Sequence, residues 1–160
     1  MSGALTRYDA ARTAVAECRS IDEAKDIADK ALALAAYARQ AHDNEMERWV
    51  AEIRLRARRR MGEISAGLQK AAGRPEKSDG ENLSQRCDKL PGKREVLKAA
   101  GVSKDEAHRC ELIARVPQEA FEAYIAEKAA LGQAVTADEV VRKVKLRSPG
   151  AGRRRAEAGQ

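Results

Sequence analysis

The chain of 160 residues carries 31 Lys and Arg against 25 Asp and Glu, which gives a formal net charge of +6. Aromatic residues make up only 3% of it, too few to fill a β-sandwich or barrel, whereas the strong helix formers Ala, Arg, Glu, Lys and Leu dominate. No run of apolar residues is long enough to cross a membrane as a helix. These features predict an all-α protein with a thin core and a charged surface.

Cysteine usage and the N-terminal sequence predict the compartment. Three cysteines, an odd number, lie far apart in the chain, and residues 1–13 lack the apolar core of a secretory signal. Both features predict reduced thiols and a cytoplasmic location. The sequence pI of about 9.4 permits binding to polyanions.

Residues 1–72 are predicted to form an N-terminal helical module. After a short helix at 2–20, apolar residues recur every three or four positions over 21–68, which is the spacing of a coiled-coil seam. The seam positions are Ala24, Ile27, Ala31, Leu34, Ala38, His42, Met46, Val50, Ile53, Ala57, Met61, Ile64 and Leu68. Because Ala buries little apolar area, this seam requires a partner helix, and we expect a homodimer through the N-terminal helices.

Two architectures suit the segment 21–71. The absence of Pro, and of any Gly before Gly62, favours one continuous helix. A helical hairpin is the alternative. Its turn would lie at 42–44, where Asn44 would cap the second helix and Glu47 would complete a capping box.

The second half of the chain is predicted to contain a linker, a small helical domain and a tail. Residues 73–92 combine Gly, Pro and polar residues without net charge, which predicts a flexible linker. Residues 93–147 return to helical patterning, and the Gly-rich, basic tail at 148–160 is expected to be disordered. The expected helices of the domain run over 93–100, 104–116, 118–130 and 137–146.

The first two of these helices carry the pattern of a helix-turn-helix unit. Gly101 would take the positive φ of the turn, and Ser103 would cap the second helix, with Glu106 closing a capping box. Leu97 occupies a position usually held by a small residue and would crowd the second helix. An ordinary helical corner has the same stop and start signals and is the alternative. The expected inward positions are Val96, Ala100, Val102, Ala107 and Cys110.

The second helix of this unit would begin with an exposed polar face. In a DNA major groove, Arg pairs with guanine, Lys or Ser contacts phosphate, and Asp accepts a hydrogen bond from cytosine. The expected partner is therefore double-stranded DNA. The candidate residues are Ser103, Lys104, Asp105, His108 and Arg109.

Two stretches resemble a known group of proteins. The residues 96–125, VLKAAGVSKDEAHRCELIARVPQEAFEAYI, resemble the helix-turn-helix region of proteins encoded near phage, prophage and plasmid genes. Those proteins are similar to the DNA-binding segment of ParB- and KorB-type partition factors. The residues 21–63 resemble the N-terminal helical half of the same phage-associated proteins. The resemblance implies a DNA-binding protein of a mobile element or its host, and no known reaction.

Further arginines are candidates for contacts with DNA phosphates, each of which would steepen the salt dependence of binding. One group lies in the basic half of the long apolar-patterned segment, where a solvated helix face is the alternative interpretation. The other group lies in the tail. The candidates are Arg56, Arg59 and Arg60, and Arg153, Arg154 and Arg155.

Sequence motifs for catalysis or metal binding are missing from the chain. It has no phosphate-binding loop, dinucleotide fingerprint or nucleophile elbow. His108 and Cys110, two positions apart on a helix, point away from each other and cannot share a metal ion. We therefore expect no enzymatic activity, cofactor or metal site. The sequence predicts a helix-turn-helix DNA-binding protein that acts as a regulator or accessory factor of a phage or other mobile element, with transcription regulation as its process. The alternative function is a coiled-coil protein that binds a protein partner without contacting DNA.

Overall fold

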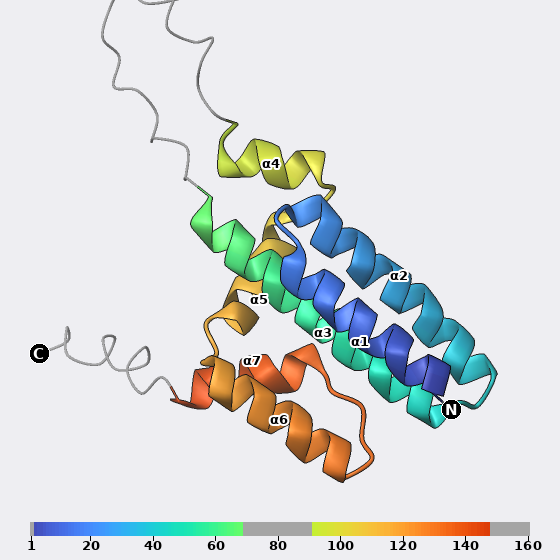
Figure 1. Cartoon of the computed structure of the whole chain (residues 1–160). Coiled ribbons are helices and arrows are strands. Elements are labelled where there is room, and N and C mark those ends of the chain that lie inside the picture. Colours follow the sequence, from blue (N-terminus) through green and yellow to red (C-terminus); the bar gives the residue numbers. More distant parts are fainter. Residues whose placement is uncertain (1, 69–90, 148–160) are drawn as a thin grey trace, which may run out of the picture.

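The computed structural model describes residues 2–68 and 91–147, and within these ranges the chain is all-helical, with seven helices and no strands (Figure 1). The predicted all-α class is confirmed. The basic tail at 148–160 and most of the predicted linker at 73–92 lie outside the described residues. The helices are α1 (Ser2–Glu17), α2 (Ile21–Gln40), α3 (Asn44–Gly67), α4 (Lys93–Ala99), α5 (Lys104–Ala114), α6 (Gln118–Ala130) and α7 (Ala137–Arg147).

The segment after residue 20 is a helical hairpin, so the continuous helix that the sequence favoured is wrong. His42 adopts a left-handed φ of 55°, and the N–H of Asp43 donates to the carbonyl of Ala38 at 2.9 Å, which closes the end of α2. The Asp43 carboxylate then accepts from the N–H of Met46 at 2.9 Å and caps α3. The cap is therefore Asp43 and not Asn44, one residue before the predicted position.

The seam of α2 differs in part from the predicted one. Its buried residues are spaced by three and four positions, but Ala28 and Ala35 replace Ile27 and Leu34, and Leu34 is 47% exposed. On α3 the predicted residues Val50, Ile53, Ala57 and Met61 are buried. The partner helix that the seam requires is thus α3 of the same chain, and small Ala side chains let the two helices lie close together.

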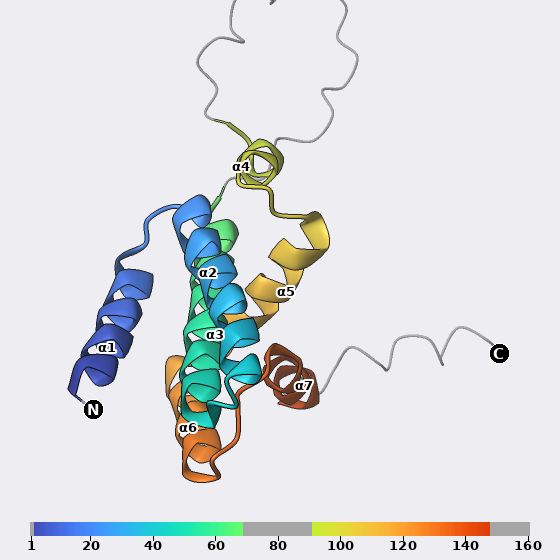
Figure 2. The ribbon, with the colours of Figure 1, turned by 90° about the vertical axis from the view of Figure 1, so that its right-hand side faces the viewer.

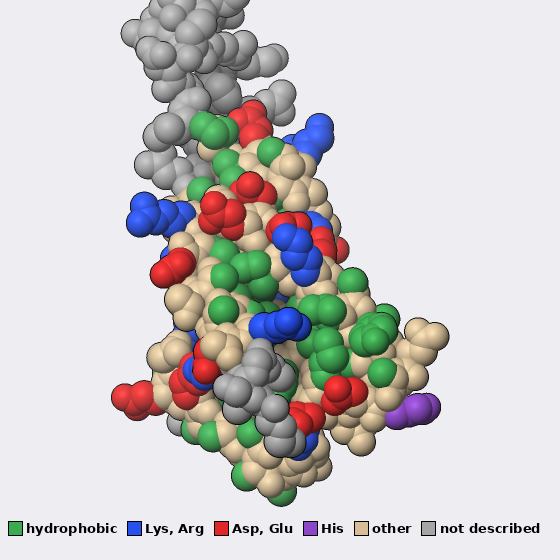
Figure 3. All heavy atoms as spheres, turned by 45° about the vertical axis from the view of Figure 1, so that its right-hand side comes forward, with side chains coloured by type: hydrophobic (Ala, Val, Ile, Leu, Met, Phe, Trp, Pro, Cys, Tyr) green, Lys and Arg blue, Asp and Glu red, His purple; other side chains and the backbone are tan. Residues whose placement is uncertain are grey.

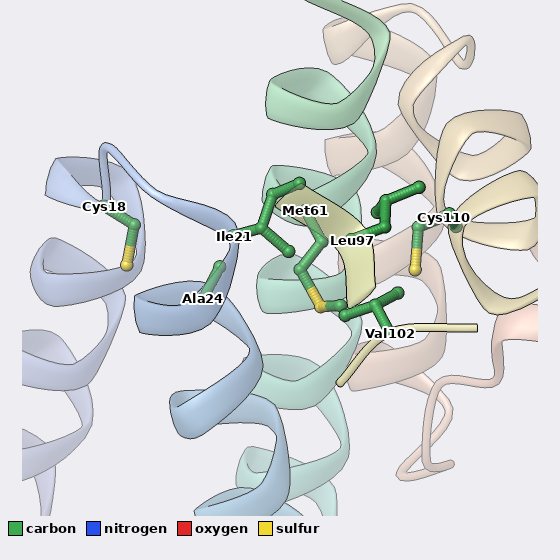
Figure 4. Packing of buried hydrophobic residues seen from close by; sticks show 8 residues of the cluster. Cys18, Ile21, Ala24, Met61, Leu97, Val102 and Cys110 are labelled. Carbon is green, nitrogen blue, oxygen red and sulfur yellow. The ribbon is translucent and has the colours of Figure 1, made fainter. Parts of the chain in front are cut away.

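Helix α3 is the centre of the molecule, because each of the three buried hydrophobic clusters contains residues from it. In the first cluster, Met61 of α3 and Ile21 at the start of α2 meet Leu97 and Val102 of the second half (Figure 4). Leu97 is therefore a core residue, and it lies in one buried cluster with residues of the hairpin and with Ala107 and Cys110 of α5. The two predicted modules, 1–72 and 93–147, share their cores.

The remaining helices surround α3 on different sides. Figure 2 shows α1 on one side of the hairpin and α5 on the other, with α4 at the top of the molecule. Phe121 and Tyr124 of α6 join Leu55 of α3 in a buried cluster that also contains Val140 of α7. Tyr8 of α1 stacks on Trp49 of α3, with ring centroids 5.6 Å apart.

Candidate nucleic-acid interface

The turn between α4 and α5 has the geometry that the sequence predicts for a helix-turn-helix unit. Gly101 has φ 66° and donates its N–H to the carbonyl of Lys98 at 3.1 Å. The N–H of Val102 donates to the carbonyl of Leu97 at 2.8 Å, and the Val102 side chain is buried. This hydrogen-bond pair ends α4 and turns the chain sharply into α5.

Helix α5 begins at the predicted cap and is held by its apolar face. The Ser103 hydroxyl accepts from the N–H of Glu106 at 3.1 Å. Ala107, Cys110 and Ile113 are buried on the inner face, against α3 and the cores around it. Burial raises the pKa of the Cys110 thiol to about 11, so this cysteine is a protonated core residue.

A polar clasp fixes the unit to the hairpin. Glu111 of α5 accepts hydrogen bonds from Lys93 of α4 and from the Ser65 hydroxyl of α3. Burial opposes ionisation of Glu111, but these two donors hold the pKa of its carboxyl below the ordinary value. Because three helices meet at one carboxylate, α5 has a fixed orientation relative to α3.

The outer face of α5 is exposed at every predicted contact position. Lys104, Asp105, His108 and Arg109 lie on the surface in the first two turns of the helix, and the N-cap Ser103 is exposed just before them. Among the described residues, neither Lys104 nor Arg109 has an ion-pair partner. Both cations are thus available to a ligand.

Sequence reasoning missed three neighbouring cations. Arg94 and Lys98 are exposed on α4, and Arg115 is exposed at the end of α5. The helical spacing of Arg94 and Lys98, which are four positions apart on one face, is the signal that would have identified these two. On one face of the molecule, charges of both signs are interspersed with hydrophobic side chains (Figure 3).

The predicted phosphate contacts on α3 lie elsewhere and pack against other helices of the fold. Arg56 donates to both oxygens of Glu122 at 2.6 Å and to Glu52 at 2.8 Å. Arg59 lies over the ring of Phe121, 4.6 Å from its centroid, and is only 9% exposed. These side chains pack between α3 and α6, away from the outer face of α5, so we remove them from the candidate DNA contacts.

The third arginine of this group is also engaged. Arg60 donates from Nε to the carbonyl of Cys18 at 2.9 Å and pairs with Glu63. The tail residues Arg153, Arg154 and Arg155 lie outside the described residues. The sequence placed Arg56, Arg59 and Arg60 on a solvated or DNA-facing surface because the arginine pattern does not reveal which further helices cover α3.

Over residues 2–68 and 91–147, no group of three or more His, Cys, Asp or Glu side chains is placed to hold a metal ion. None of the described helices combines the length and apolar character needed to cross a bilayer. Comparisons with protein-family models, with curated proteins and with solved structures give no match.

Proposed function

We propose that the chain is a helix-turn-helix DNA-binding protein and that α5 enters the major groove. One observation carries the proposal: the outer face of α5 presents four exposed polar residues beside the exposed N-cap, while its inner face is fixed to α3 by apolar packing and by the hydrogen bonds of Glu111. A recognition helix requires both an accessible polar face and a rigid attachment. The resemblance to phage- and plasmid-associated proteins supports the same proposal and extends it to a regulator or accessory factor of a mobile element.

Each contact residue has a distinct expected role. Arg109 pairs with a guanine edge, and Asp105 accepts from a cytosine amino group. Lys104 contacts phosphate at the start of α5, and Arg94 and Lys98 contact the backbone that α4 crosses. His108 lies between the base-contacting positions on the same exposed face.

The experiment is selection of bound fragments from a random duplex library by the purified protein, followed by titration of the selected site. Arg109→Ala should weaken the specific site by roughly 1–3 kcal/mol and relax the preference at one base pair. Lys104→Ala should weaken all sequences alike and lower the salt slope by about 1. Arg19→Ala, an exposed arginine between α1 and α2 that lies outside the helix-turn-helix unit and outside the groove between α1, α2 and α3, is the matched control and should leave binding unchanged. Absence of binding to any duplex at low salt would contradict the proposal.

A homodimer is part of the proposal, because two half-sites require two copies of the recognition helix. The seam residues are used inside one chain, so we place the dimer contact on the groove between α1, α2 and α3. This apolar groove has a volume of about 750 Å³ and is lined by Leu34, Met46 and Trp49, among others. Tyr37, 63% exposed, lies one turn of α2 from Leu34.

Sedimentation of single variants tests the dimer contact. Leu34→Asp should convert the dimer to a monomer and weaken binding to a two-half-site duplex. Leu131→Asp, at a leucine 61% exposed on the opposite half of the chain, is the matched control and should remain dimeric. A wild-type monomer that binds no DNA would instead favour the alternative function, in which the same exposed apolar residues bind a different protein.

A further inference from the structure

A second cavity lies on the side of α3 away from α5. It has a volume of about 590 Å³ between α1, α3 and α6, within the range of small-molecule sites. Four arginines line it, together with three carboxylates and the apolar side chains of Val15, Ala16 and Phe121. The arginines are Arg12, Arg56, Arg59 and Arg60, and the carboxylates are Asp9, Glu63 and Glu122.

The arginine donors in this cavity are not all used within the fold. Glu122 is satisfied by Arg56, and Glu63 is shared between Arg59 and Arg60. Nη1 of Arg59 is buried and has no hydrogen-bond partner among the described residues. Because Arg59 is only 9% exposed, this donor has lost water without gaining an acceptor, which is an unfavourable state. A rotation of the guanidinium toward the cavity would let a bound anion accept from it.

Two other features favour an anion at the same place. Arg12 is exposed at the rim and has no ion-pair partner among the described residues; its guanidinium carbon lies 5.7 Å from the centroid of the Tyr8 ring. The N-terminus of α6 also borders the cavity at Gln118, and no side chain caps it. Uncapped N–H groups and the helix dipole attract a negative group.

We propose that this cavity binds a small anion with a phosphate group, either inorganic phosphate or a phosphomonoester. Arg59 and Arg12 are its guanidinium donors, and the first turn of α6 forms its edge. Guanidinium groups match phosphate because they donate two parallel hydrogen bonds to its oxygens. The cavity lies between α1, α3 and α6, and α5 lies on the other side of α3, so a duplex held by α5 does not supply this phosphate. The proposal does not depend on DNA binding.

Calorimetric titration of the full chain tests the proposal, with inorganic phosphate, adenosine monophosphate and adenosine as probes at constant ionic strength set by chloride. We expect saturable binding at one site for phosphate, for the monophosphate or for both, and none for adenosine. The affinities for inorganic phosphate and for adenosine monophosphate are then compared. The tighter of the two shows whether the site binds free phosphate or a phosphomonoester. No saturation by either anion up to about 10 mM, well above a Kd of about 1 mM, would overturn the proposal.

Single substitutions of arginines test whether the anion binds in this cavity. Arg12→Gln removes an exposed guanidinium that has no ion-pair partner among the described residues, and it should weaken anion binding about ten-fold or more. Arg7→Gln, on the same helix but outside the cavity, is the matched control and should bind as the wild type does. Arg59→Met should abolish anion binding. If the Arg59→Met protein does not fold, the Arg12→Gln protein still decides the test. Equal affinity of the Arg12 and Arg7 variants, or displacement of the anion by an excess of duplex DNA, would contradict the proposed site.

Discussion

The two sides of α3 are packed by opposite means. Towards α5, Gly62 has no side chain, and a Cβ placed there would lie 2.1 Å from the carbonyl oxygen of Cys110. Towards α1 and α6, the long side chains of Arg56 and Arg59 fill the space around Phe121. Backbone contact through a glycine leaves no freedom for α5. Long charged side chains instead leave a lined cavity and a donor without a partner among the described residues. One side of α3 thus holds α5 rigidly, and the other leaves the space in which we propose that an anion binds.

The largest loss of stability should come from Gly62→Ala, on the side of α3 that faces α5. The added methyl group meets backbone rather than a movable side chain, so α5 must shift away from α3. We expect a loss of about 3 kcal/mol in the free energy of unfolding, measured with urea, together with weaker DNA binding. Gly67→Ala in the last position of the same helix has nothing within 4 Å of the new Cβ and should be neutral or slightly stabilising. Equal stability of the two variants would show that the close contact between α3 and α5 is not needed.

Acidic pH should destabilise the other side of α3, where Arg56 pairs with Glu122. The hydrogen bonds from Arg56 hold the pKa of Glu122 below its ordinary value, against the opposing effect of burial. A carboxyl group whose pKa is lowered by folding stabilises the fold above its unfolded pKa, and the contribution is lost as the pH falls through the folded pKa. Stability should therefore decrease below about pH 4.5.

The substitution Glu122→Gln measures how much of the stability lost at acidic pH comes from the ion pair of Arg56 with Glu122. The Glu122 side chain is 39% exposed, so the loss at neutral pH should be at most about 1 kcal/mol. Below pH 4.5, the urea-unfolding free energy of the variant should depend less steeply on pH than that of the wild type. Parallel curves for the two proteins would assign the acid sensitivity to other carboxyl groups, such as Glu111, whose pKa is also lowered.

The smallest effect should come from His42→Gly, at the hairpin turn and outside both sides of α3. His42 holds a left-handed φ that glycine adopts without steric cost, whereas glycine loses more chain entropy on folding. We expect a net gain of about 0.5 kcal/mol in unfolding free energy, with DNA and phosphate binding unchanged. A change in either binding property would mean that the turn is coupled to the packing around α3.

Local signals predicted the turn between α4 and α5 well. Gly101, Val102 and Ser103 have the conformation, burial and capping bond expected of them, because a turn and a cap depend on residues within a few positions. The sequence was less informative about the hairpin. The residues at 41–44 contain no Gly or Pro, and the turn there depends on a histidine in a conformation that side chains rarely adopt.

The sequence by itself determined that the chain is helical, where α5 begins, and which of its residues form an exposed polar face. These properties follow from residue propensities, caps and helical periodicity. Only the tertiary structure decided the roles of Arg56, Arg59 and Gly62. Each depends on which helix covers a given side of α3, and that choice is made by residues up to 66 positions away in the chain, as in the pair of Arg56 with Glu122. Periodicity along one helix does not contain that information, because it indicates which residues share a face and not what packs against that face.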